Sequence, residues 1–263
     1  MSLTSTVEQV APGVIRVRHL FVNAYIIGTE ESWVVVDAAL QGAADEIIAA
    51  AADAFGPDAT PTAIVLTHGH FDHVGALSAL VERWDVPIWA HPLEVPHLTG
   101  QEDYPPPDPT VGKGAMALLS FAYPHRAYDF GERVRPLALD YVVPGLADWK
   151  WIHTPGHSKG HISLYRDSDA LLVAGDAFVT VEQESLYQVL RQTQEIHGPP
   201  AYFTPDWATA EESIRMLNAL QPQLAATGHG TPMSGAELTQ GLADLVMHFD
   251  EIAIPNRGRY LPD

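Results

Sequence analysis

The sequence contains no cysteine among its 263 residues. This absence excludes disulfide bonds, thiolate nucleophiles, thiolate metal sites and iron–sulfur clusters. Any metal site in this chain must therefore be built from histidine, aspartate and glutamate side chains.

Positive charge is also scarce in this chain. It has 14 lysine and arginine residues against 33 aspartate and glutamate residues, which gives a formal net charge of −19. Because so acidic a surface repels polyanions, we expect a small-molecule substrate and no nucleic-acid partner. The oligomeric state is left open, a homodimer being one of the alternatives.

Long apolar runs are missing too. No stretch approaches the roughly 20 apolar residues of a transmembrane helix, and residues 1–10 have neither the basic nor the apolar segment of a signal peptide. We therefore expect a cytoplasmic protein with no membrane contact. With 46% hydrophobic residues the chain can still build a sizeable core. Since no linker separates two parts, we expect a single domain over residues 1–263.

The most informative segment follows the apolar run 63–66, which is typical of a buried strand. Directly after it, residues 67–73 contain three histidines and one aspartate, and Gly69 is expected to let this loop turn tightly. Imidazole and carboxylate groups are ligands that zinc prefers, and four are too many for one ion with an open position. We therefore predict two metal ions that share the loop. The assigned donors are His68 and His70 for one ion and Asp72 and His73 for the other.

The rest of the chain alternates strands and helices. An antiparallel meander of three short strands at 13–17, 23–27 and 33–36 precedes a helix at 43–55. The remaining expected elements are helices at 75–83, 210–220 and 236–250, and strands at 87–90, near 142, and at 150–153, 162–165, 171–174 and 224–226.

Two segments interrupt this alternation. Residues 99–131 are an inserted segment whose proline run at 105–109 can form neither a helix nor a central strand, and a short apolar helix at 115–121 follows it. Residues 183–209 mix glutamine, histidine and proline with aromatic residues. We predict that both segments form the wall of a substrate site. The predicted substrate contacts are Lys113, Tyr187 and Arg191.

Three later motifs share one pattern, in which a strand ends and a glycine-flanked histidine or aspartate follows. They contain His157, Asp176 and His229. Because loops at strand ends are where rigid scaffolds present reactive groups, these residues can supply further metal ligands.

Taken in order, these histidines and aspartates resemble the metal-binding motifs of the metallo-β-lactamase superfamily, which includes glyoxalase II-like hydrolases. The resemblance covers roughly residues 10–250. It implies an α+β fold, a four-layer αββα sandwich, with metals at one edge between two sheets. The implied ligands are His68, His70 and His157 for the first ion, Asp72, His73 and His229 for the second, and Asp176 as a bridge between both.

The resemblance also implies two supporting residues. Asp37 matches the early aspartate of the family, which follows a strand and orients the ligand loop. His161 is expected to support the ligands rather than to bind metal.

The implied activity is hydrolysis by two zinc ions, with iron or manganese as alternatives in one or both positions. Two divalent ions about 3.5–4 Å apart lower the pKa of a shared water, and the bridging hydroxide attacks a carbonyl or phosphoryl centre. Asp72 is the predicted catalytic residue, because a carboxylate beside the nucleophile can carry a proton to the leaving group.

The sequence differs from the residue patterns of some members of the family, and these differences limit the range of expected substrates. Asp176 argues against a true β-lactamase, and Val179 stands where the family's homoserine-lactone lactonases place a tyrosine. We expect hydrolysis of a small-molecule ester, lactone or thioester. Two alternatives stay open: a mononuclear iron persulfide dioxygenase of the same fold, and a phosphodiesterase or nuclease.

Overall fold

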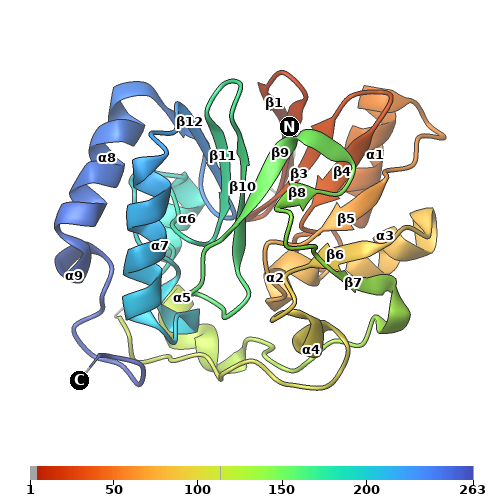
Figure 1. Ribbon diagram of the computed structural model, residues 1–263. Helices are drawn as coiled ribbons and strands as arrows, with labels where there is room; N and C mark the ends of the chain where they lie inside the picture. The colour runs from red at the N-terminus through yellow and green to blue at the C-terminus, as the bar shows by residue number, and fades with distance from the viewer. Residues whose placement is uncertain (1–4, 113, 263) are drawn as a thin grey trace. The chain divides into compact units, whose positions relative to one another are not determined.

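The computed structural model describes residues 5–112 and 114–262 (Figure 1). The chain divides into two compact units. The first comprises the described residues up to Asp103 together with Arg126–Trp149, and the second comprises Tyr104–His125 and the described residues from Lys150 onward. The expected insertion at 99–131 is therefore divided, with its centre in the second unit and its two ends in the first. That the chain forms a single domain stays a prediction.

The first unit is built on a seven-stranded mixed sheet with the order β1-β2-β3-β4-β5-β6-β7. Strands β1 to β4 pair antiparallel, whereas β4 to β7 run parallel to one another. Parallel neighbours need crossover connections, which contain the helices of this unit. The strands are β1 (Ser5–Ala11), β2 (Val14–His19), β3 (Val22–Gly28), β4 (Trp33–Val36), β5 (Ala63–Val65), β6 (Ile88–Ala90) and β7 (Val134–Pro136). The helices are α1 (Ala44–Phe55), α2 (Phe71–Val74), α3 (Leu77–Trp84), α4 (Val95–Leu98) and the 3₁₀ turn η2 (Gly131–Arg133).

The core of the first unit lies between this sheet and the apolar faces of α1 and α3. Trp33 of β4 is buried there, with its ring stacked on Phe55 at 4.9 Å and edge-on to Trp84 at 5.7 Å between centroids. Aromatic pairs in these geometries add to the free energy gained from buried area. The carboxyl ends of β4 and β5 are thus held on a rigid support.

The second sheet has the order β13-β12-β11-β10-β9-β8. Strand β9 begins in the first unit and ends in the second, and β11 runs antiparallel to β10 but parallel to β12. Helices α7 and α8 pack against each other in the second unit (Figure 1). The strands are β8 (Val142–Val143), β9 (Leu146–His153), β10 (Ile162–Arg166), β11 (Leu171–Gly175), β12 (Leu224–Thr227) and β13 (Met233–Ser234). The helices are α5 (Ala115–Leu119), α6 (Leu186–Arg191), α7 (Trp207–Ala219), α8 (Gly235–Met247) and α9 (Phe249–Ile252), with 3₁₀ turns η1 (Ser120–Ala122) and η3 (Ala201–Phe203).

Two mixed sheets with flanking helices confirm the expected α+β class. Several elements differ from expectation. Residues 71–74 form α2 instead of a loop, and the helix expected at 236–250 is interrupted between Met247 and Phe249. The irregular segment 183–209 contains α6, whose first turn is capped by the Ser185 hydroxyl, which accepts from the Gln188 N–H. Among the described residues, no helix is both long and apolar enough to cross a bilayer.

Candidate metal centre

In the first unit, the predicted ligands follow the carboxyl ends of two parallel strands. Val36 of β4 pairs with Val65 of β5, and the Asp37 N–H donates to the Val65 carbonyl at 3.0 Å. Parallel strands deliver their carboxyl ends to one sheet edge, where ligands commonly bind. Asp37 and the loop after β5 therefore leave the sheet together.

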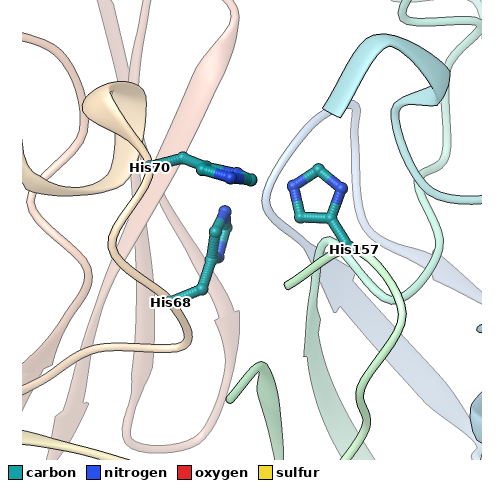
Figure 2. A group of neighbouring side chains, drawn as sticks. All are labelled: His68, His70 and His157. Atoms are coloured by element: carbon teal, nitrogen blue, oxygen red, sulfur yellow. The ribbon is translucent and has the colours of Figure 1, made fainter. Parts of the chain in front are cut away.

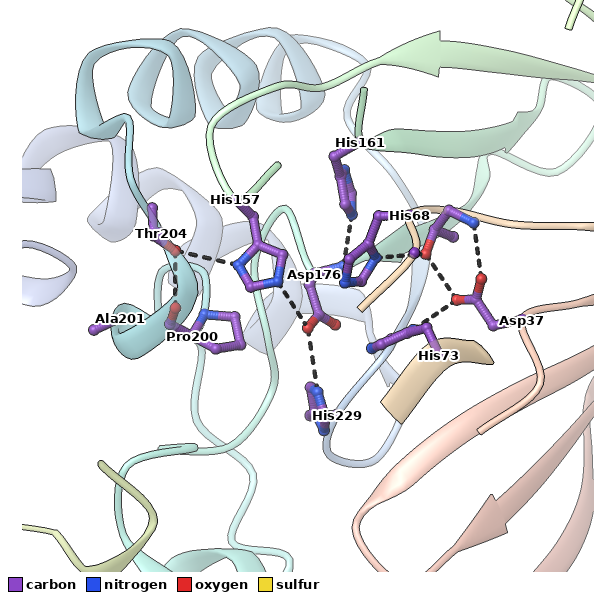
Figure 3. Close-up of polar contacts among 12 residues, drawn as sticks. Asp37, His68, His73, His157, His161, Asp176, Pro200, Ala201, Thr204 and His229 are labelled. Carbon is purple, nitrogen blue, oxygen red and sulfur yellow. Dashed lines mark hydrogen bonds and ion pairs between the residues drawn. The ribbon is translucent and has the colours of Figure 1, made fainter. Parts of the chain in front are cut away.

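The Asp37 side chain accepts several hydrogen bonds from this loop. Its buried carboxylate accepts hydrogen bonds from the Thr67 N–H at 2.8 Å, the Thr67 hydroxyl at 2.7 Å and His73 Nδ1 at 2.9 Å (Figure 3). Its φ of +61° is in the left-handed region, which aspartate enters more readily than most residues. These three donors provide hydrogen bonds to a carboxylate that would be costly to bury without them.

These contacts fix the tautomers of two imidazoles. A carboxylate without a proton only accepts, so His73 carries its hydrogen on Nδ1. The single hydroxyl hydrogen of Thr67 goes to Asp37, so the oxygen can only accept from His68 Nδ1 at 3.0 Å. In the neutral form of each ring the lone pair is therefore on Nε2, which is the nitrogen that would bind a metal.

The four predicted donors of the first unit are buried and close together. The ring centroid of His68 is 4.7 Å from that of His70 and 4.2 Å from that of His73. Ligand atoms of Asp72 and His73 lie within 4.8 Å of each other. Figure 2 shows the neighbouring His68 and His70 rings; it also draws His157, which belongs to the second unit.

A short helical turn, α2, supplies the last of these donors. Its position is fixed by backbone bonds, since the Ala38 N–H donates to the His73 carbonyl at 2.7 Å and the Gly75 N–H donates to the Ala39 carbonyl at 2.8 Å. A Cβ at Gly75 would lie 2.3 Å from the backbone nitrogen of Gln41, so only glycine allows this approach.

Gly69 has an ordinary backbone conformation and a buried hydrogen-bond partner. Its φ is not positive, so the loop does not depend on a left-handed glycine. Its N–H instead donates to the buried carboxylate of Glu94 at 3.0 Å. The sequence reasoning missed Glu94, because nothing in its local sequence distinguishes it from other polar residues. It also missed Tyr128, whose pKa is raised by burial and by the nearby Asp72 carboxylate.

In the second unit, two predicted ligands follow the parallel strands β11 and β12. Gly175 pairs with Thr227, and the Gly228 N–H donates to the Gly175 carbonyl at 2.8 Å. Asp176 and His229 therefore leave the sheet side by side. One oxygen of Asp176, Oδ2, lies 3.2 Å from His229 Nε2 and 3.5 Å from His157 Nε2 (Figure 3). All three residues are buried.

The loop that carries His157 is pressed against α7. Gly156 has φ +132°, and a Cβ there would lie 2.5 Å from the Cα of Ala210. The Ser213 hydroxyl of the same helix donates to the Pro155 carbonyl at 2.7 Å. Helix α7 therefore fixes this loop from one side.

His161 supports Asp176 and is not placed as a ligand. Its Nδ1 lies 3.1 Å from the Thr154 carbonyl and must donate to it, while its Nε2 accepts from the Asp176 N–H at 2.9 Å. The ring is therefore neutral with its hydrogen on Nδ1. It holds the backbone of the predicted bridging residue.

The predicted substrate contacts that the structure describes are exposed, whereas the predicted metal ligands are buried. The Arg191 guanidinium lies 5.1 Å from the centroid of the Tyr187 ring on α6, and both side chains are exposed. Lys113 lies outside the described residues. That any of the three contacts a substrate stays a prediction.

The two predicted wall segments contact each other within the second unit. The Tyr123 ring lies 5.7 Å from that of Tyr202 and 6.3 Å from that of Phe203, measured between centroids. A cavity of about 310 Å³ lies where these segments meet the C-terminal residues 252–255. Its described lining includes Glu182, Glu184 and His197 but no lysine or arginine.

The residues of both units fit a divalent metal centre. Each unit offers imidazole groups next to at least one carboxylate, and all of these groups are buried. Burying so many ionisable groups is costly unless they are paired or coordinate a cation. A borderline divalent ion with nitrogen and oxygen ligands satisfies that requirement.

Comparison with known proteins supports this interpretation. A family model described as the metallo-beta-lactamase superfamily matches residues 17–229. The chain is 47% identical to the probable metallo-hydrolase YflN of Bacillus subtilis (strain 168) over 233 residues, 88% of each chain. It is 30% identical to the probable metallo-hydrolase YybB of the same organism over 209 residues, 80% of each. The solved structure of TTHA1623 in a di-iron-bound form is 28% identical and has a TM-score of 0.54, covering 82% of this chain and 90% of that one.

Proposed function

Because the chain belongs to the metallo-β-lactamase superfamily, it is a metal-dependent hydrolase, and we propose that it uses two metal ions to cleave a small-molecule ester, lactone or thioester. Superfamily membership also confirms the expected αββα fold class. The observation that carries the proposal is the set of seven buried donors, several with tautomers suited to binding metal. The joining of the two clusters into one centre is part of the proposal.

Zinc is the proposed metal, because a set of imidazoles and carboxylates without thiolate suits it. Iron and manganese are the alternatives, and the related TTHA1623 was solved in a di-iron-bound form. The proposed ligands are His68, His70 and His157 for one ion, Asp72, His73 and His229 for the other, and Asp176 for both.

The proposed mechanism divides the work between metal and protein. When bound, such ions lower the pKa of water and act as Lewis acids toward a carbonyl oxygen. Asp72 accepts the proton of the attacking water and delivers it to the leaving oxygen or sulfur. Asp37 and His161 keep the ligands in place, because each is hydrogen-bonded to residues beside the reacting centre.

The substrate class follows from the wall segments. A cavity of about 310 Å³ is at the small end of ligand sites, and the aliphatic side chains in its lining, among them Val111, Ile252 and Ile254, suit an apolar substrate. Carboxylates in its described lining disfavour phosphate and other anionic groups. The net charge of −19 likewise supports the absence of a nucleic-acid or membrane partner. The proposed location is the cytoplasm.

Metal analysis combined with a hydrolysis panel tests this function. Purified protein should carry close to two equivalents of zinc, or of a related divalent ion, per chain. Zinc-loaded protein should cleave aryl esters, lactones or thioesters faster than phosphodiesters or a chromogenic cephalosporin. A fixed content of one iron, with oxygen consumption on a persulfide, would establish the dioxygenase instead. Clear preference for a phosphodiester would establish the nuclease alternative.

Asp176→Ala is the variant that tests the bridge. We expect metal content to fall from two toward one per chain, and kcat/KM to fall at least about 100-fold, since even supporting partners of metal ligands are worth about 10–100-fold. Circular dichroism should show a folded protein. Asp167→Ala, at an exposed carboxylate that pairs with Lys150, is the matched control and should leave metal content and kcat/KM unchanged.

A further inference from the structure

Thr204 lies at the end of η3 with its side chain buried against the loop of His157. Its hydroxyl donates to the Pro200 carbonyl at 2.8 Å and lies 3.2 Å from His157 Nδ1 (Figure 3). The sequence reasoning assigned Thr204 only to a wall segment. Its contact with a predicted metal ligand gives it a different role.

The hydrogen positions in this contact can be deduced. A threonine hydroxyl has one hydrogen, and a carbonyl oxygen can only accept, so that hydrogen is committed to Pro200. Toward His157 the Thr204 oxygen can therefore only accept, which requires the hydrogen of His157 to be on Nδ1. Nε2 is then the nitrogen left to bind a metal, and it lies 3.5 Å from Asp176 Oδ2.

The turn that carries Thr204 is itself fixed at several points. The Ala201 N–H donates to Glu184 Oε1 at 2.7 Å, and the Tyr202 carbonyl accepts from the Asp108 N–H at 2.8 Å. Beyond Thr204, the Asp206 N–H donates to the Gly156 carbonyl, next to His157, at 3.3 Å. The hydroxyl is therefore held in place by backbone contacts on both sides.

We propose that Thr204 is a positioning residue that fixes His157 in the Nδ1-protonated tautomer and so presents Nε2 to the metal. Partners of this kind set the ring orientation of metal-binding histidines and raise their affinity for the ion. The effect on metal affinity rests on the proposed function, whereas the tautomer does not. The wall segment 183–209 thus also orients a metal ligand.

The tautomer is measured directly by nitrogen-15 NMR of the metal-free protein, with the His157 ring assigned by comparison with His157→Gln. We expect hydrogen on Nδ1 in the wild type and in Thr204→Ser, which keeps the hydroxyl. Thr204→Val keeps the shape but loses the acceptor, so its His157 should shift toward the Nε2-protonated form. A His157 ring without hydrogen on Nδ1 in the wild type would overturn the proposal even if the valine variant does not fold.

The second measurement is zinc affinity, obtained by competition with a chromophoric chelator. Thr204→Val should bind zinc about 10–100-fold more weakly than the wild type, and Thr204→Ser within about threefold of it. Thr209→Val is the matched control, because its hydroxyl donates to the Asp206 carbonyl at 3.4 Å and not to a predicted metal ligand, and it should bind zinc as the wild type does.

The outcomes separate this inference from the proposed function. If the wild type binds no divalent metal, the proposed function fails while the tautomer still tests Thr204. If the wild type binds zinc tightly and Thr204→Val binds it equally well, the positioning role of Thr204 is wrong and the metal centre stands. Loss of affinity in Thr204→Ser as large as in Thr204→Val would also contradict the role of the hydroxyl.

Discussion

The two units support their predicted metal-binding groups in different ways. In the first unit, four predicted donors lie within six consecutive positions after one strand. The buried carboxylate of Asp37 accepts hydrogen bonds from Thr67, beside these donors, and from His73, which is one of them. In the second unit, three donors follow three different strands, and neutral groups hold them, namely His161, Thr204 and the Thr227 hydroxyl, which donates to the His229 carbonyl at 2.6 Å.

The difference is one of charge as well as of sequence spacing. A carboxylate behind an imidazole raises its basicity and favours a bound cation, whereas a hydroxyl or carbonyl mainly fixes orientation. A buried charge that loses its partners is also more costly than a neutral group that does so. We therefore expect the charged support of the first unit to be the more sensitive to substitution.

The largest effect is expected from Asp37→Ala. It removes the acceptor of three buried hydrogen bonds and places alanine at a φ of +61°. We expect a loss of about 3–5 kcal/mol in the free energy of unfolding, the range for breaking a buried charged partnership. Urea unfolding of the chelator-treated protein, followed by tryptophan fluorescence, measures it without a contribution from bound metal.

Two further variants sharpen the result for Asp37. Asp37→Asn tolerates the left-handed backbone and keeps one acceptor, so it should lose less than Asp37→Ala. Asp53→Ala, at an exposed position of α1, should change the free energy of unfolding by no more than about 0.5 kcal/mol. Equal losses of unfolding free energy in Asp37→Ala and Asp53→Ala would show that the Asp37 carboxylate does not stabilise the first unit.

A smaller effect is expected from His161→Ala in the second unit. It leaves the Asp176 N–H and the Thr154 carbonyl without their partner in the interior, each a neutral group. We expect a loss of about 1–3 kcal/mol, measured by the same unfolding experiment. His153→Ala is the control, since His153 is only half-buried and contacts the Lys159 carbonyl. A loss for His161→Ala larger than that for Asp37→Ala would contradict the expectation that the first unit is the more sensitive to substitution.

The same contrast explains what could be predicted from the sequence. The predicted donors of the first unit are close together in the sequence, so their density after an apolar strand was enough to predict them without a structure. Asp176 and His229 are brought together only by the parallel pairing of β11 and β12, and the family resemblance was needed to connect them. Strands 13–17, 23–27 and 33–36 were predicted because apolar runs between turn residues mark them.

What the sequence did not reveal depends on tertiary contacts. Strand β1 is largely polar and only partly buried, so no alternating pattern marks it. Helix α2 is one turn long, and its position depends on contacts with residues 38–41. Thr204 and Glu94 are ordinary polar residues in their local sequence, and only the folded backbone brings them to His157 and Gly69.

The smallest effect concerns pH and Glu184, which fixes the turn before Thr204. Burial raises the pKa of Glu184 above its usual range, so the folded chain holds this proton more tightly than the unfolded chain does. The group therefore lowers the free energy of unfolding progressively as pH rises from the ordinary carboxyl pKa, about 4.3, through the raised value.

Glu184→Gln keeps an acceptor for the Ala201 N–H without that charge. We expect its free energy of unfolding to gain on the wild type as pH rises from about 4 to 7. Urea titrations at several pH values measure the difference in free energy of unfolding between the variant and the wild type. If this difference stays constant across that range, the charge of Glu184 does not destabilise the fold.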